Sequence, residues 1–399
     1  MVILRKPLSI LAALMLVFTA SNALASDTVD SIKVESHEVN EEHATHEDAE
    51  GHESLSPKEV INEHIAHHLK DDYYFTFFAD EAENKHYGFA LPVILIDNGL
   101  KVFSASEFHY GETTVEKDGQ FYVLHHGKIY KTDATGDLKL DEHHHPTAEK
   151  PINFSITKNV FSLLITAILL FVMFTSLAKT YKNGPNSLPK GFSRVLEPLV
   201  IYVRDEIARP NIGEKKYKKF MPFLLTVFFL IWLLNLIGLT PLGINVTGNI
   251  TVTLCLALFT FFITQFSANK DYWGHIFWMP GVPVPMKIIL APIEVLGMFT
   301  KPFSLMIRLF ANITAGHTVV MGLIAIVFLM KEQLSTGGAI GTSLALTLFI
   351  SIIELLVAFL QAFIFTMLSS LFIGMAVQDH HHDEHHSEDV LGEHDNSIV

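Results

Sequence analysis

The chain has 399 residues and a formal net charge of −14. Its mean hydropathy of +0.33 excludes an ordinary soluble globular protein. The charge is unevenly spread, because residues 26–153 hold 27 acidic side chains and ten lysines while the remainder is slightly basic. Two such halves indicate two environments. The one cysteine, Cys255, lies in an apolar run, which excludes a disulfide framework and favours a buried structural role.

Residues 1–25 have the pattern of a secretory signal peptide. Arg5 and Lys6 form a positive start, residues 8–20 an apolar core, and residues 23–25 (ALA) a small-residue cleavage site. The apolar core is short for a membrane-spanning helix, although an uncleaved anchor helix stays open as an alternative. In both cases the segment that follows is expected to be exported.

Residues 26–72 are acidic, rich in histidine and poor in large apolar side chains, a composition typical of disorder. The histidines have no tight ligand spacing, so a solvated acidic tail is favoured over a zinc or copper site. A second histidine-rich segment, residues 379–399, is interpreted as a solvated cytoplasmic tail. We expect no metal site and no cofactor. The histidines of the first segment are His37, His43, His46, His52, His64, His67 and His68.

Residues 73–153 change character. Short apolar or alternating runs are separated by turn signals at residues 97–99 (DNG) and 118–119 (DG). These are strand and hairpin signals, and they predict a small β-rich extracytoplasmic domain. A linker into the membrane is expected to begin at residues 143–146 (HHHP).

Residues 154–378 predict an all-α polytopic membrane domain of about five helices. The loop of residues 179–219 carries ten Lys and Arg side chains, which places it in the cytoplasm by the positive-inside rule. The number of spans then puts the C-terminus in the cytoplasm as well. The predicted spans are residues 156–178, 220–239, 247–266, 288–330 and 339–377.

The last two apolar runs are unusually long. About forty helical residues cover about 60 Å, twice the ~30 Å of a hydrocarbon core. The two helices are therefore expected to tilt steeply, kink or break, and Pro292 and Pro302 are candidate kink points.

Arg308 lies near the middle of the fourth apolar run. Arginine cannot lose its proton, and at the centre of a membrane helix it costs about 2.5–3.5 kcal/mol on insertion scales. Glu294, Lys301 and Arg308 recur every seven residues, as do Glu354 and Gln361 in the fifth run, so each set lies near one helix face. Two such polar faces predict an ion path. A structural Arg308 paired to Glu294 or Glu354 stays open.

Residues 301–317 (KPFSLMIRLFANITAGH) and 354–376 (ELLVAFLQAFIFTMLSSLFIGMA) resemble the last two membrane helices of subunit a of F-type ATP synthase. Residues 231–243 (IWLLNLIGLTPLG) and 249–254 (NITVTL) are similar to its earlier helices. The resemblance covers residues 154–377 and does not extend to 26–153. It implies a non-catalytic, ion-conducting stator in a bacterial inner membrane. The implied partners are a rotating ring of c subunits, b-type peripheral stalk subunits and other subunits of the complex.

The resemblance also implies roles for individual residues. Arg308 matches the arginine that faces the ring carboxylates. Glu294 matches an acidic position near the opposite exit of the ion path, away from the outer half-channel. Some bacterial members carry the acid on the first of the two helices and the histidine on the second, whereas here His317 comes first and Glu354 second. Which of the two relays protons stays open. Both suit proton relay, so H⁺ is predicted over Na⁺. The positions that match the outer half-channel are Asn312, His317, Glu354 and Gln361.

Two other function classes compete. A secondary transporter for a cation or metal would use Arg308, His317 and Glu354 as substrate ligands, but no inverted repeat is visible between the halves. A receptor-like sensor with a periplasmic metal-binding domain lacks a cytoplasmic signalling domain. The sequence has no G-x-x-x-x-G-K-[ST] loop, so we expect ATP chemistry to occur elsewhere in the complex.

Overall fold

The computed structural model describes residues 71–378, except 81–84, 126, 139–145, 183–190, 192, 241–243, 245 and 280. The predicted signal peptide, the C-terminal tail and nearly all of the first histidine-rich segment lie outside the described residues. The start of the predicted linker, residues 143–145, also lies outside them.

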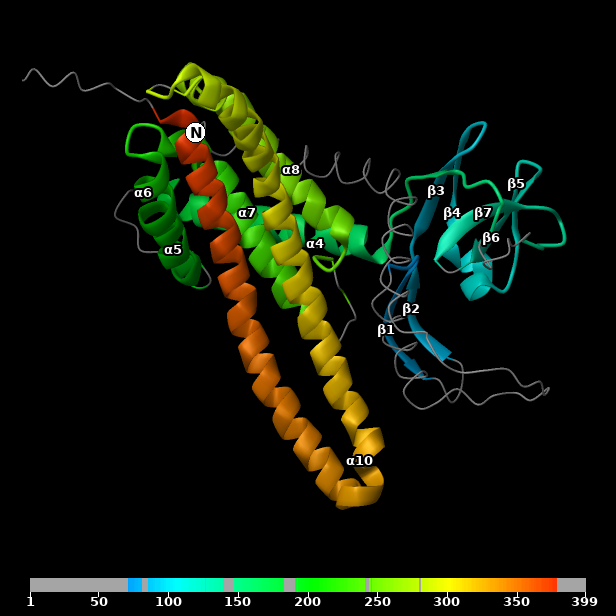
Figure 1. Ribbon diagram of the computed structural model, residues 1–399. Coiled ribbons are helices and arrows are strands. Elements are labelled where there is room, and N and C mark those ends of the chain that lie inside the picture. Colours follow the sequence, from blue (N-terminus) through cyan, green and yellow to red (C-terminus); the bar gives the residue numbers. More distant parts are fainter. Residues whose placement is uncertain are drawn as a thin grey trace, which may run out of the picture.

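A set of short antiparallel strands precedes the helices and lies to one side of them (Figure 1). They form a two-stranded sheet and two three-stranded sheets, in the orders β1-β2, β4-β3-β8 and β5-β6-β7. The prediction of a β-rich segment here is confirmed. The strands are β1 (Tyr74–Asp80), β2 (Lys85–Ala90), β3 (Pro92–Ile96), β4 (Leu100–Ser104), β5 (Val115–Lys117), β6 (Gln120–His125), β7 (Lys128–Thr132) and β8 (Ile152–Asn153).

Both predicted hairpin turns are present. Asn98, between β3 and β4, has a φ of 51°, and Asp118, between β5 and β6, has a φ of 52°. Asn and Asp tolerate this left-handed region better than other residues with a side chain, and each is followed here by glycine. Residues 105–111 form a 3-10 helix, η1 (Ala105–Gly111), whose first turn is capped by the Ser104 side chain.

The strand domain is attached to the start of the first long helix, α4 (Lys158–Lys182). The Asp71 carboxylate accepts a hydrogen bond from the Asn159 amide at 3.1 Å, and the Asp72 carbonyl accepts one from the Lys158 amide at 2.8 Å. Residues 71 and 72 therefore satisfy amides of the first helical turn, as a local cap would. The Phe161 ring adds edge-on contacts, 5.4 Å from the ring centroids of both Phe75 and Phe89.

Among the described residues, five helices are long and apolar enough to cross a membrane, as the sequence predicts. The first three candidate spans lie in α4, α7 (Tyr217–Gly238) and α8 (Ile250–Ser267). The last two, Val284–Gly316 and Leu344–Val377, belong to one element, α10 (Val284–Val377). Figure 1 shows α10 as a hairpin of two long antiparallel arms with a turn far from the other helices. Pro292 and Pro302 both lie inside the first arm.

The loop that the sequence predicts to be cytoplasmic contains helices that its charge pattern did not indicate. It holds α5 (Ser193–Tyr202), a π-helical segment η2 (Val203–Ala208) and α6 (Arg209–Ile212), and a further short helix, α9 (Lys270–Phe277), follows α8. The carbonyl of Ile207 in η2 accepts hydrogen bonds from Asn211 Nδ2 at 2.7 Å and from Ser370 Oγ of α10 at 3.0 Å. Gly374 brings the end of α10 against the Asn211 backbone, where a Cβ would collide.

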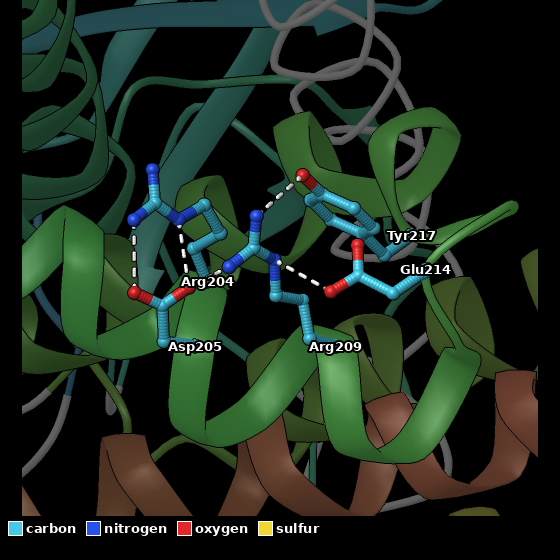
Figure 2. Close-up of polar contacts among 5 residues, drawn as sticks. All are labelled: Arg204, Asp205, Arg209, Glu214 and Tyr217. Atoms are coloured by element: carbon cyan, nitrogen blue, oxygen red, sulfur yellow. Dashed lines mark hydrogen bonds and ion pairs between the residues drawn. The ribbon is translucent and has the colours of Figure 1, made fainter.

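An ionic network holds the connection between α6 and α7 (Figure 2). Asp205 Oδ1 accepts hydrogen bonds from Arg204 Nε and Arg209 Nη1, each at 2.8 Å. Arg209 also faces Glu214 at 3.4 Å and lies over the Tyr217 ring, with 5.2 Å to its centroid. The network fixes the chain at the point where it turns back into the apolar helices.

Candidate functional site

The polar side chains of α10 lie on both arms of the hairpin. On the first arm Arg308, Asn312 and Gly316 are four residues apart, so they lie on successive turns of one helix face. On the second arm Glu354 and Gln361 are seven residues apart, again near one face. We call Arg308, Asn312, Glu354 and Gln361 the polar stripe.

A hydrogen bond joins the arms at the middle of the polar stripe. Asn312 Nδ2 donates to Gln361 Oε1 at 2.7 Å. Gln361 is only 2% exposed, so its amide oxygen needs a partner within the protein. Gln361 therefore makes an interhelical hydrogen bond.

Glu354 lies against Gly316 on the opposite arm. A Cβ built on Gly316 would be 2.6 Å from Glu354 Oε1, so the absence of a side chain at residue 316 makes room for the carboxylate. The side chain of His317 lies outside what the structure describes. Its helical backbone directly follows Gly316, so the acid of the second arm reaches the part of the first arm that carries the histidine.

Arg308 is half-buried. Among the described residues no ion pair joins it to Glu294 or Glu354, so the alternative of a structural ion pair within the chain has no support from this geometry. A fixed charge at this depth then requires water or an anionic partner from outside the chain. Ala311 and Ala315, which flank the stripe, are small and exposed, and small side chains allow another helix to approach closely.

The arms of α10 leave most of their surface uncovered. In an apolar 18-residue stretch of each α10 span, buried residues make up 17% and 22%, against 67% in such a stretch of α7. Apolar side chains dominate this surface, including Phe303 and Ile307 beside Arg308. A partner helix or lipid therefore has to cover it.

Glu294 and Lys301 lie apart from the polar stripe. Glu294 is half-buried and precedes Arg308 by fourteen residues, about 21 Å along a helix. Lys301 lines a crevice beside α8 and α9, on the side of the arm that packs against these helices. The charge of Glu294 acts on Lys301 through space, but the structure brings neither of the two to the polar stripe.

Further polar contacts, which sequence reasoning did not single out, hold the second arm in register. Asn235 of α7 accepts a hydrogen bond from Thr247 at 2.9 Å, and its amide lies 3.5 Å from the Ala358 carbonyl. Thr260 of α8 and Ser369 of α10 place their hydroxyls 3.5 Å apart. Polar residues inside apolar runs were the available signal, but their partners depend on the packing of the helices.

Five apolar spans, a membrane-depth arginine without an ion-pair partner among the described residues, and a carboxylate on the facing arm together define a polytopic, ion-conducting membrane protein. A family model described as ATP synthase A chain matches residues 160–374, more than half of the chain. The chain belongs to this family.

Similar proteins carry the same description. "ATP synthase subunit a 2" of Chlorobaculum tepidum is 44% identical over 247 residues, which are 60% of this chain and 68% of the relative. "ATP synthase subunit a 2" of Prosthecochloris aestuarii is 40% identical over 280 residues, 66% of this chain and 84% of the relative. A second family model, a domain of unknown function (DUF8433), matches residues 64–154 and includes every described strand.

Membership in this family makes the chain a multi-pass protein of a bacterial inner membrane. It is a non-catalytic component of the membrane sector, the proton-conducting stator that works with the c-ring and the other subunits of the ATP synthase. Nothing in the comparisons favours a cation or metal transporter.

Proposed function

We propose that the α10 hairpin supplies the stator side of two proton half-channels, and that Arg308 separates them. The observation that carries this proposal is the contact between the arms. Asn312 bonds Gln361, and Glu354 lies in the space left by Gly316, so polar groups of both arms form one stripe with Arg308.

The chemistry follows from the charges. A carboxyl group on a ring subunit is neutral while it faces lipid, because burying its charged form is costly. Beside Arg308 the charged form is favoured by the opposite charge, so the group releases its proton there. Arg308 keeps its own proton and cannot pass it on. A proton therefore cannot bypass the ring by crossing Arg308.

Each of the remaining site residues has a place in this path. Asn312 and Gln361 line the outer half-channel, in which His317 and Glu354 relay protons near Gly316. Glu294 lies toward the exit on the other side. Proton relay by imidazole and carboxylate groups favours H⁺ over Na⁺ as the coupling ion.

We propose a topology with the strand domain in the periplasm and the C-terminus in the cytoplasm. The basic loop supports it, because ten Lys and Arg side chains lie within residues 179–219. The loop helix α6 packs on the C-terminal end of α10, which puts both at one end of the bundle. The strand domain is attached at the opposite end of α4 (Figure 1). In this topology residues 1–25 are the signal peptide, residues 73–153 are the periplasmic domain and residues 154–378 are the membrane domain. The long arms of α10 cross the bilayer with a steep tilt.

Proton pumping driven by ATP in inverted membrane vesicles tests the separator role. Arg308→Ala is expected to abolish pumping and to add a passive proton leak, while the complex assembles normally. Arg194→Ala is the matched control, since Arg194 is exposed on α5 outside the apolar helices. Pumping at the wild-type rate in Arg308→Ala would refute the proposal.

A further inference from the structure

A crevice separate from the polar stripe opens between α8, α9 and the first arm of α10. Lys301 of α10, Gln265 at the end of α8 and Tyr272 of α9 line it. Thr260 and Thr264 of α8 line it too, but their hydroxyls donate to carbonyls of their own helix. The rest of its wall is mainly apolar. The lining residues that close it are Phe261, Met298, Pro302, Leu305 and Phe372.

The Lys301 ammonium has no hydrogen bond or ion pair among the described residues. The side chain is half-buried, and Nζ lies 5.4 Å from the centroid of the Phe372 ring. A cation–π contact at this distance is favourable, but it gives the three N–H donors no acceptor. The carboxylate of Glu294 acts on the ammonium only through space, so the N–H donors are left for an oxygen ligand from outside the chain.

Gln265 has a second unsatisfied group in the same crevice. Its Oε1 is buried and makes no hydrogen bond within the described structure. Rotation of the carboxamide by half a turn would present two N–H donors at this position instead, since the oxygen and nitrogen of such a group are interchangeable in shape. In that orientation Gln265 and Lys301 both donate to one oxygen-rich ligand.

The side chains around the crevice are of the kind found at a membrane surface. Phe266, at the end of α8, is 87% exposed, and Phe277 and Trp278 are also exposed beside α9. The Lys287 ammonium lies 4.4 Å from the Trp278 ring centroid. Exposed aromatic rings with adjacent lysines are typical of the interface between acyl chains and headgroups.

The C-terminal end of α10 lies at the same level. The Asn269 side chain, just before α9, donates to the Val377 carbonyl at 2.9 Å, and Lys216, just before α7, donates to the same carbonyl at 2.6 Å. The basic loop and the crevice therefore share one end of the bundle. In the topology proposed above, this end faces the cytoplasmic leaflet.

We propose that the crevice around Lys301 binds the phosphate of an anionic membrane lipid. The phosphate oxygens accept from Lys301 and from the rotated Gln265 amide, and Tyr272 adds a hydroxyl. The acyl chains lie over Phe261 and Phe299, whose rings are 5.7 Å apart. Basic pockets between membrane helices on the cytoplasmic side bind lipid headgroups in this way.

Photolabelling of the intact, reconstituted ATP synthase tests this site. The probes are phosphatidylglycerol and phosphatidylcholine that carry the same photoactivatable group near the headgroup. Peptides of α8 and of the first α10 arm are expected to be labelled about fivefold more by phosphatidylglycerol, the factor that corresponds to ~1 kcal/mol for one lysine near the surface. Lys301→Gln is expected to reduce this preference to parity, and Lys301→Arg to keep it.

Lys287→Gln serves as the matched control and is expected to leave the preference unchanged, because Lys287 lies over Trp278 and outside the crevice lining. A preference that persists in Lys301→Gln would overturn the proposal. If inorganic phosphate suppressed the labelling by both lipids equally, the crevice would be a site for free phosphate, and the proposal would also be overturned. The proposal would be overturned as well if Lys301→Gln lost pumping to the same extent at every phosphatidylglycerol content. That result would place Lys301 in the ion path. None of these outcomes depends on the result for Arg308→Ala.

Discussion

Gly316→Ala tests the contact between the two arms directly. The added Cβ would lie 2.6 Å from Glu354 Oε1, whereas ordinary van der Waals contact begins at 3.4 Å, so the carboxylate must move by about 0.8 Å. Overpacking of this kind costs about 1–3 kcal/mol. Replacing glycine by alanine within a helix returns about 1 kcal/mol. Stability should therefore change little, while the position of the carboxylate changes.

The expected effect is on proton translocation. A displacement near 1 Å of a positioned group can reduce a rate by up to about 10²-fold, so we expect ATP-driven pumping by Gly316→Ala to fall by about tenfold or more. Gly297→Ala is the control on the same arm, because nothing lies within 4 Å of a Cβ built there. The double variant Gly316→Ala/Glu354→Asp shortens the acid and should recover part of the rate. Equal pumping by Gly316→Ala and Gly297→Ala would refute the reasoning.

Three further variants probe other contacts. Gln361→Leu removes the partner of the Asn312 amide and should reduce pumping and destabilise the hairpin by about 0.6–1.7 kcal/mol, as measured by thermal unfolding of the complex. Lys131 donates to Asp97 and holds the pKa of that carboxyl below its ordinary value, so its contribution to stability is present above the unfolded-state pKa and is lost as pH falls through the folded-state pKa. Asp97→Asn should therefore flatten the acid loss of hydrogen-exchange protection in the strand domain. Phe161→Ala removes the edge-on ring contacts to Phe75 and Phe89, each worth about 0.5–1.5 kcal/mol beyond buried area, and should speed proteolysis of residues 73–153 without changing pumping.

Each of these variants has an outcome that would contradict its reasoning. For Gln361→Leu it is wild-type pumping together with unchanged thermal unfolding. For Asp97→Asn it is an acid limb as steep as that of the wild type. Phe161→Ala would count against the attachment of the strand domain if its cleavage rate matched that of Phe171→Ala, a change of the same size at an exposed position of the same helix.

The apolar runs were sufficient to locate the membrane helices. An apolar run can satisfy the hydrogen bonds of its backbone in lipid only as a helix. Each of the five predicted spans contains a helix that is long and apolar enough to cross a membrane. The seven-residue spacing likewise predicted which polar residues share a face. Spacing does not determine how far one helix is rotated or shifted against another. The pairing of Asn312 with Gln361, and the position of Lys301 beside α8, therefore required the structure.

The helices of the basic loop and the division of strands between sheets had no clear signal in the local sequence. Pro198 lies inside α5 and Pro210 in the first turn of α6, and proline is unfavourable inside a helix, so the loop carried no clear helix signal. The loop nevertheless forms helices, which pack on α10 through Ile207 and Asn211. Similarly, the largely apolar run of residues 88–97 is divided between two sheets, because β2 ends at Ala90 and the Leu91 amide donates to the Tyr73 carbonyl before β3 begins. Both outcomes depend on partners distant in sequence.

The attachment at Asp71 has a mechanical consequence. Asp71 and Asp72 accept hydrogen bonds from the first turn of α4, so the two ends of the strand domain, residues 72 and 158, lie next to each other. The segment before residue 71 therefore joins the structure at the first turn of a membrane helix rather than at the far side of the domain. A pull on that segment would load the first turn of α4 directly, without straining the sheets.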